Sequence, residues 1–303
     1  MAFIKVVNKV LKCGGKVVTN DPNPLKLPPF TIRCKFSSGY TPTMGDSQTL
    51  VDATENVWDI TKNSTDWSFL FDGTKDDPGF PYLLKVLGAN STGVTDMNTM
   101  FRNCNQMESV ARFDTSSVTS TLNMFNRCSK LTTIPQYCLQ SATDVRQMFM
   151  LCSGLRWIPP IILPSATSTM NMFSDCTGLS TITLVTGTSL TNVQGTFQKC
   201  TGLLDVPIFN TSTVTHFNAM CSGCSSLINV PLLDTRSATS VKNMFNDCAG
   251  VRSGALAMYN QMSSQSTVPG THDDAFNHCG ASTEPGRAEL EMIPVSWGGL
   301  NPD

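Results

Sequence analysis

Apolar residues recur along most of the chain with a period of 24 residues. Each period carries the pattern Met-Phe-x-x-Cys-x-x-Leu-x-x-Ile or a close variant, with short polar stretches between one pattern and the next. The cysteines of the pattern follow one another without slippage at seven positions: Cys104, Cys128, Cys152, Cys176, Cys200, Cys224 and Cys248. A fixed period of this length indicates a repeat protein, because so small a unit cannot bury its apolar side alone and must stack on its neighbours.

Within one period the spacing of the apolar residues changes character. The residues before the cysteine follow helical spacing and predict a helix of about two to three turns: Ala142, Val145, Met148, Phe149 and Cys152. The stretch 155–161, with Leu155 and Ile158 three residues apart and Pro159 after them, resembles the short extended segment of a leucine-rich repeat, in which each coil contributes one strand to a parallel sheet. Serine, threonine and aspartate between the periods are expected to cap the helices and close the turns. We therefore expect an α/β repeat fold, a solenoid in which each coil contributes a short helix and a short parallel strand.

Repeats of this form, joined by segments such as Asp-Thr-Ser-x-Val-Thr, resemble the BspA-like leucine-rich repeats of bacterial surface proteins and of proteins encoded by phages of gut bacteria. The resemblance covers about residues 92–279. The segments 31–67 and 293–299 resemble those that precede and close such repeats in phage-type members. The resemblance implies a leucine-rich-repeat solenoid that serves recognition or virion structure, and it supplies no catalytic residues.

The pattern predicts four segments: an N-terminal arm and linker (1–30), an N-terminal cap with a degenerate first coil (31–91), seven 24-residue leucine-rich repeats (92–262), and an atypical last coil with a C-terminal cap (263–303). In the N-terminal cap, Thr31–Phe36 alternates as a strand, and Leu70 and Phe71 occupy the Met-Phe positions. In the last coil, Phe276 follows Phe245 after 31 residues, and Trp297 is expected to cover the end of the stack.

The first residues bear on where the protein is found. Lysines and asparagines interrupt the apolar residues of Met1–Thr19, and no small-residue cleavage site follows, so we expect no signal peptide. The arm contains several prolines and would fray unless something held it. We expect it to dock in a larger assembly; the alternative is that it folds back on its own domain.

Composition and charge exclude some classes of partner. A formal net charge of −2 with scattered ionic groups disfavours binding to nucleic acid or to an anionic membrane. No stretch approaches the ~20 apolar residues of a membrane-spanning helix. The cysteines occur once per period and lack paired spacing, which favours packing in a core over disulfides or zinc. The local pair Cys221 and Cys224 leaves a redox role open as an alternative.

No constellation of reacting groups indicates an enzyme or a cofactor. The sequence has neither a glycine-rich phosphate loop nor a Gly-x-Ser-x-Gly elbow. His272 and His278 lie near acidic residues and are a weak candidate for a metal site, with an ordinary solvated loop as the alternative.

Two sets of positions on the predicted strand side are candidates for binding. The column five residues after each cysteine includes Thr133, Trp157, Thr181, Asp205 and Asn229, in which Trp157 could stack on a sugar ring or a partner side chain, or instead cover apolar surface. The column eight residues after the cysteine turns apolar at Leu184, Ile208, Leu232 and Leu256. The residues that follow this second column, such as Val185 and Leu233, are apolar too. The sequence therefore does not decide whether the second column or the residues beside it point inward. If the second column is exposed, a contact with another subunit or virion protein is expected.

These observations lead us to expect a non-enzymatic, virion-associated structural or recognition protein of a phage. The arm would anchor it to other virion proteins, and the solenoid would display a surface for binding, with a homo-oligomer as a further possibility. The alternative is an adhesin on a bacterial cell surface that binds a host protein or glycan.

Overall fold

The computed structural model describes residues 11–13, 16–18, 25–72, 80–182, 185–207 and 209–302. The parts of the arm at 1–10, 14–15 and 19–24 and the candidate interface residues Leu184 and Ile208 lie outside the described residues. Within the arm, β1 (Leu11–Cys13) and β2 (Lys16–Val18) pair as an antiparallel hairpin.

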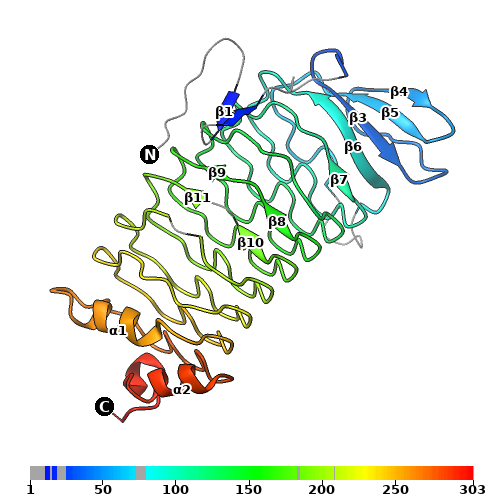
Figure 1. The fold of residues 1–303 in the computed structure, drawn as a ribbon. Helices are drawn as coiled ribbons and strands as arrows, with labels where there is room; N and C mark the ends of the chain where they lie inside the picture. Colours follow the sequence, from blue (N-terminus) through cyan, green and yellow to red (C-terminus); the bar gives the residue numbers. More distant parts are fainter. Residues whose placement is uncertain are drawn as a thin grey trace.

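A five-stranded sheet forms one end of the molecule (Figure 1). Its strands lie in the order β4-β5-β3-β6-β7, with the bounds β3 (Thr31–Phe36), β4 (Ser47–Asp52), β5 (Val57–Thr61), β6 (Leu83–Asn90) and β7 (Ser109–Val110). Neighbouring strands are antiparallel except β6 and β7, which are parallel. The strand predicted from alternation at 31–36 is β3. Because β7 belongs to the first 24-residue repeat, the sheet joins the cap to the repeats.

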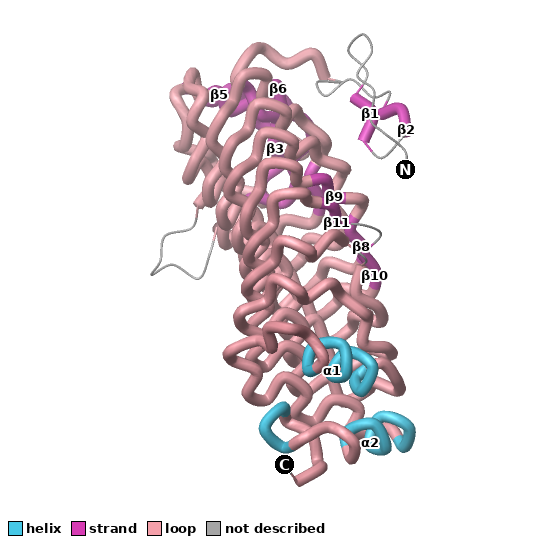
Figure 2. Tube along the Cα trace, turned by 90° about the vertical axis from the view of Figure 1, so that its left-hand side faces the viewer, coloured by secondary structure: helices cyan, strands magenta, loops and turns pink. Residues whose placement is uncertain are grey.

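The repeats form coils that stack along the long axis of the molecule (Figures 1 and 2). β8 (Trp157–Ile158) pairs in parallel with β10 (Thr181–Ile182), and β9 (Ile161–Ile162) pairs in parallel with β11 (Val185–Thr186). A second row of single parallel bridges links one coil to the next through Asp96, Ser120 and Asp144, and again through Asn192, His216 and Ser240. All these pairings join residues 24 positions apart, so the sequence period is also the register of the stack.

The helix predicted in each coil is wrong. The coils form turns there, and among the described residues α-helices occur only near the C-terminal end. The reason is a pair of left-handed residues in every coil, five residues and one residue before the cysteine; in the coil of Cys152 these are Gln147 (φ 57°) and Leu151 (φ 62°). A right-handed helix cannot continue through residues in the left-handed region.

The turns give each coil its hydrogen bonds to the next. The amide of Met148 donates to Val145 O within the coil at 3.4 Å, whereas the amide of Phe149 donates to Met172 O of the next coil at 2.9 Å. Alternate amides of this segment therefore serve the turn and the stack. In an α-helix every amide would donate within its own segment. Here half of the amides donate to the next coil, so residues at helical spacing build a stack.

Hydroxyl side chains also join the coils instead of capping helices. Thr143 Oγ1 donates to Thr119 O at 3.1 Å, and Ser141 Oγ donates to Ser116 O at 2.8 Å. Carboxylate side chains close turns as predicted: Asp114 Oδ1 accepts the Ser116 amide at 2.9 Å.

Stacked aromatic rings run through the core. Successive phenylalanine rings lie 5.3–5.8 Å apart and within 12° of parallel: Phe71, Phe101, Phe125, Phe149, Phe173 and Phe197. Cys221 interrupts the series, which resumes with Phe245 and Phe276 at 6.0 Å. All these side chains are buried.

The C-terminal end contains the helices α1 (Ala255–Ser263), α2 (Glu284–Leu290) and the 3-10 helix η1 (Val295–Trp297). Trp297 lies over the last coil: its carbonyl accepts the Phe276 amide at 2.9 Å, and its buried ring contacts His272 and Tyr259 edge-on. The cap therefore covers apolar residues that a further coil would otherwise bury.

Candidate binding surface

The cysteines of the repeats are part of the core. Each thiol donates to the carbonyl oxygen of the residue 27 positions earlier in most coils, as in Cys152 to Phe125 O at 3.0 Å and Cys176 to Phe149 O at 3.0 Å. Burial raises the pKa of the Cys152 thiol to about 12. A thiol that is buried, protonated and hydrogen-bonded is a poor nucleophile and a poor metal ligand.

The pair Cys221 and Cys224 is also part of the core, but its two thiols differ: a hydrogen bond between the two side chains lowers the pKa of the Cys224 thiol. Both residues are buried and neither forms a disulfide. Burial raises the pKa of the Cys221 thiol, and the carbonyl of Cys221 accepts the thiol of Cys248 at 3.0 Å. Cys221 therefore substitutes for a core phenylalanine of the stack, and its thiol lies away from any soluble oxidant.

The two candidate metal ligands lie in different surroundings. His278 Nδ1 pairs with Asp247 Oδ1 at 2.9 Å on the surface. His272 lies against Trp297, its buried Nδ1 atom has no partner in the described part of the chain, and burial lowers its pKa. Among the described residues no three His, Cys, Asp or Glu side chains gather as metal ligands would. Cys279, which follows His278, is in the core.

The column five residues after each cysteine is exposed along the whole stack: Ser109, Thr133, Trp157, Thr181, Asp205, Asn229 and Ser253. Trp157 pairs with Thr181 in the parallel register of β8 and β10, and Asn229 pairs with Ser253 in the same way. The following residue of each coil up to that of Cys224, such as Ile158 or Ile182, is buried. The structure therefore brings the predicted binding residues together on one continuous surface.

A small hollow lies on this surface immediately after Trp157 along the stack. It has a volume of about 110 Å³ and is lined by residues of two coils: Ser180, Thr181, Ile182, Leu204, Asp205, Val206 and Pro207. Its floor is apolar because Ile182 and Val206 are buried, and its rim carries the exposed side chains of Thr181 and Asp205.

In the column eight residues after the cysteine, Leu232 points outward and its neighbour Leu233 points inward. Leu232 is 64% exposed, whereas Leu233 is 4% exposed and Val185 is 2% exposed. Leu256 is different, because it lies on α1 and packs partly buried against the core. The predicted apolar stripe therefore does not continue to Leu256.

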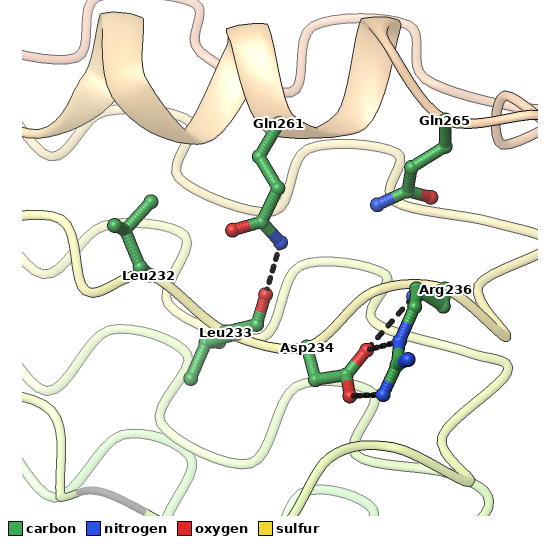
Figure 3. Close-up of a pocket in the computed structure, with 6 residues that line it drawn as sticks. All are labelled: Leu232, Leu233, Asp234, Arg236, Gln261 and Gln265. Atoms are coloured by element: carbon green, nitrogen blue, oxygen red, sulfur yellow. Dashed lines mark hydrogen bonds and ion pairs between the residues drawn. The ribbon is translucent and has the colours of Figure 1, made fainter.

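A groove lies between α1 and the preceding coil, next to Leu232 (Figure 3). Its volume is about 450 Å³. Figure 3 shows Gln261 reaching from α1 to Leu233 O, a hydrogen bond of 2.5 Å, while Arg236 and Asp234 form an ion pair at the other end. The polar groups that line the groove are thus largely engaged with each other or with the backbone.

The family model described as "Mycoplasma protein of unknown function, DUF285" matches residues 65–183 and 167–267. The two matches overlap, and together they run from the first coil of the stack to α1, which is more than half of the chain. The chain belongs to the DUF285 family. This family is related to the BspA-like repeats. No curated protein and no solved structure matches the chain.

In this DUF285 chain, the described residues include no helix long and apolar enough to cross a membrane. Sequence reasoning missed Leu204 and Ile228, which lie four residues after their cysteines and are 43% and 38% exposed. A signal was present, since other coils carry Glu108, Arg156 and Arg252 at this position. An apolar residue in a column that is otherwise polar marks surface that differs from the rest of the stack.

Proposed function

We propose that the protein is a non-enzymatic recognition protein of a phage particle, built as a BspA-like leucine-rich-repeat solenoid whose strand-side surface binds a partner. The observation that carries the proposal is the exposed column five residues after each cysteine, from Ser109 to Ser253. A rigid stack holds these side chains in one row, at the roughly 4.8 Å spacing of neighbouring strands. Extended surfaces of this kind are how solenoid proteins recognise partners.

The groups that could react support binding over catalysis. The repeat thiols are buried, and burial raises the pKa of most of them, as it does for Cys152; the exception is Cys224, whose pKa the hydrogen bond with the Cys221 thiol lowers, and it is buried as well. His278 pairs with Asp247, and His216 Nδ1 lies 2.8 Å from Thr215 Oγ1 in the row of bridges between coils. Catalysis needs a nucleophile and a base directed at one place, and these groups are distributed over different parts of the stack.

The phage assignment is supported by the resemblance of the repeats and of both flanking segments to phage-type members. In the arm and linker, the residues that the structure describes include a point of attachment to the cap: Leu27 is buried, and its carbonyl accepts Asn90 Nδ2 of β6 at 2.9 Å. This contact ties the linker to the cap at the sheet end of the stack.

The test is to look for the protein in purified phage particles. We expect mass spectrometry of particles purified by density gradient to find the chain, and gold-labelled antibody against residues 92–262 to decorate intact particles. A variant without residues 1–24 should be lost from particles although its coil stack still folds. Absence of the protein from particles, or its recovery in the bacterial envelope, would overturn the phage role and favour the adhesin.

A further inference from the structure

We propose that Trp157 and the hollow beside it form a binding site for a neutral carbohydrate chain. This inference deepens the proposed recognition role of the strand-side surface and rests on it, but it does not depend on where the protein is located. Three features carry it: an indole ring without a partner, hydrogen-bonding groups without a partner next to it, and the register that places them side by side.

Trp157 differs from the other three tryptophans of the chain. Trp58 Nε1 donates to Asn56 Oδ1, Trp67 Nε1 donates to Lys62 O, and Trp297 is buried against two rings. Trp157 is 44% exposed, and within the described ranges it makes neither a hydrogen bond through its indole nitrogen nor a contact with another ring. Leaving so large an apolar ring in water between threonines has a cost that a bound ligand would remove.

The hollow supplies hydrogen-bonding groups that, like the indole ring, have no partner among the described residues. Asp205 is exposed, and its carboxylate makes no hydrogen bond or ion pair with any residue that the structure describes. The hydroxyl of Thr181 is likewise without a partner in the described chain. Many other polar side chains of the stack do have partners, such as Asp144 with Arg146 and Ser180 with the carbonyl of Arg156. Asp205 and Thr181 can therefore accept hydrogen bonds from a ligand without breaking any existing ones.

The parallel register aligns the ring with the hollow. Thr181 is the strand partner of Trp157 and also lines the hollow, and Asp205 occupies the same column in the following coil. From Trp157 to Asp205 the surface runs two coil spacings, about 9.6 Å at ~4.8 Å per strand. This distance suits a short oligosaccharide lying along the stack more than a single ring.

The chemistry of the site favours a sugar. One face of a pyranose presents C–H groups that can stack on an indole ring, while its hydroxyls donate to carboxylate and threonine oxygens. Leu204 adds an apolar edge, 43% exposed, on the rim of the hollow. The unpaired carboxylate of Asp205 would repel an acidic ligand, so the site suits neutral sugars.

The experiment uses the full 303-residue chain and an array of immobilised oligosaccharides of glucose, galactose, mannose and N-acetylglucosamine. We expect binding to at least one of them. Calorimetry with the best oligosaccharide should show at least about tenfold weaker binding for Trp157→Ala, with partial retention in Trp157→Phe, and about three- to tenfold weaker binding for Asp205→Asn. Ligand should shift the tryptophan fluorescence of the natural chain but not that of Trp157→Ala.

Matched controls are Leu300→Ala, which shortens an apolar side chain that is 57% exposed on the C-terminal cap, and Asp273→Asn, which neutralises an exposed carboxylate on another surface. Both should bind like the natural chain. Binding of none of the sugars, equal binding by Trp157→Ala, or capture of a protein through Trp157 with no sugar bound would overturn the carbohydrate assignment. If the protein binds sugar but is absent from particles, only the phage role is contradicted. If it is found in particles but binds no sugar, only the carbohydrate site is contradicted.

Discussion

At the scale of single residues, the repeated cysteine both packs in the core and donates a hydrogen bond. It is small enough to fit beside the stacked phenylalanine rings, and its thiol donates to a carbonyl of the preceding coil, at 3.0 Å for Cys152 and 3.1 Å for Cys128. Alanine would fill less of the space and supply no donor. Serine would supply a donor but is less apolar. The structure thus gives a reason for cysteine where the sequence alone indicated only a small buried residue.

These thiols make stability depend on alkaline pH. In the native chain burial raises the pKa of Cys152 from 9.0 to about 12. The unfolded chain therefore loses this proton first as the pH rises, so it binds fewer protons than the native chain between these two values, and unfolding becomes easier. We expect the free energy of unfolding, measured with urea, to fall from about pH 9 upward by up to ~1.4 kcal/mol per pH unit for each such thiol.

The control for this pH dependence is Cys152→Ala. It should be less stable at neutral pH, because it leaves a gap, but its stability should fall less steeply above pH 9 than that of the natural chain. Identical slopes for the two proteins would show that the thiol of Cys152 does not contribute.

The phenylalanine stack predicts a large cost for losing one ring. Phe149 is fully buried between Phe125 and Phe173, 5.5 Å and 5.6 Å away. Phe149→Ala should lower the free energy of unfolding by about 3–5 kcal/mol, because it leaves a cavity that a rigid stack cannot close. Leu232→Ala, at an exposed position, should change it by less than about 0.5 kcal/mol. A loss below ~1 kcal/mol for Phe149→Ala would contradict the packing seen here.

At the scale of elements, the main difference between expectation and structure is the turn segment before each cysteine. Apolar residues at helical spacing point to one side in a helix, but they also do so in a chain of tight turns of similar period. The signal that separates the two was present: the left-handed positions often carry residues that tolerate positive φ, among them Asn103, Asn171, Asp175, Gly195 and Gly223. Recurrent Asn, Asp and Gly at two fixed positions of a repeat argue against a helix.

Gln147 offers a test of this backbone geometry. Its φ is 57°, and Gly195 occupies the same position two coils later with φ 60°. Gln147→Val should destabilise the protein by about 1–2 kcal/mol, because a β-branched residue is strained in the left-handed region. Gln147→Gly should cost little or nothing, and Thr181→Val, at an exposed strand position, serves as the matched valine control. Thermal unfolding of the three variants measures the difference; equal stability of Gln147→Val and Thr181→Val would argue against the left-handed turn.

At the scale of the whole molecule, the hydrogen bonds between described residues join each coil to its neighbours and to the caps. The row of bridges from Asp66 through Asp96 and Ser120 to Asp144 continues from coil to coil, and Trp297 closes the end. Such a stack should tolerate the loss of a whole period but not of a fraction of one, because only a whole period preserves the register.

Removal of residues 153–176 therefore gives a sharp test. This deletion takes out one complete period and joins Cys152 to Thr177 in register. We expect a soluble, folded protein with a lower melting temperature and a circular dichroism spectrum like that of the natural chain. Removal of residues 153–164 breaks the register and should give an unfolded or insoluble chain. Similar behaviour of the two deletions would contradict a stack built on a 24-residue register.

The sequence by itself determined the period, the inward positions around each cysteine and the ends of the stack. Cys152, Phe149 and Leu155 are buried where the pattern requires, and Phe71, Phe276 and Trp297 lie in the terminal layers that their spacing predicts. The pattern within one period is enough for this, because hydrophobic periodicity indicates which side chains are buried whatever the backbone conformation.

Only the tertiary structure decided how the backbone carries those side chains and what the surface becomes. Turns replace helices because amides bond to the next coil, and Leu233, not Leu232, is the buried residue of that pair. The hollow beside Trp157 exists only where two coils meet. These features depend on contacts between residues about 24 positions apart, and the pattern within one period does not contain them.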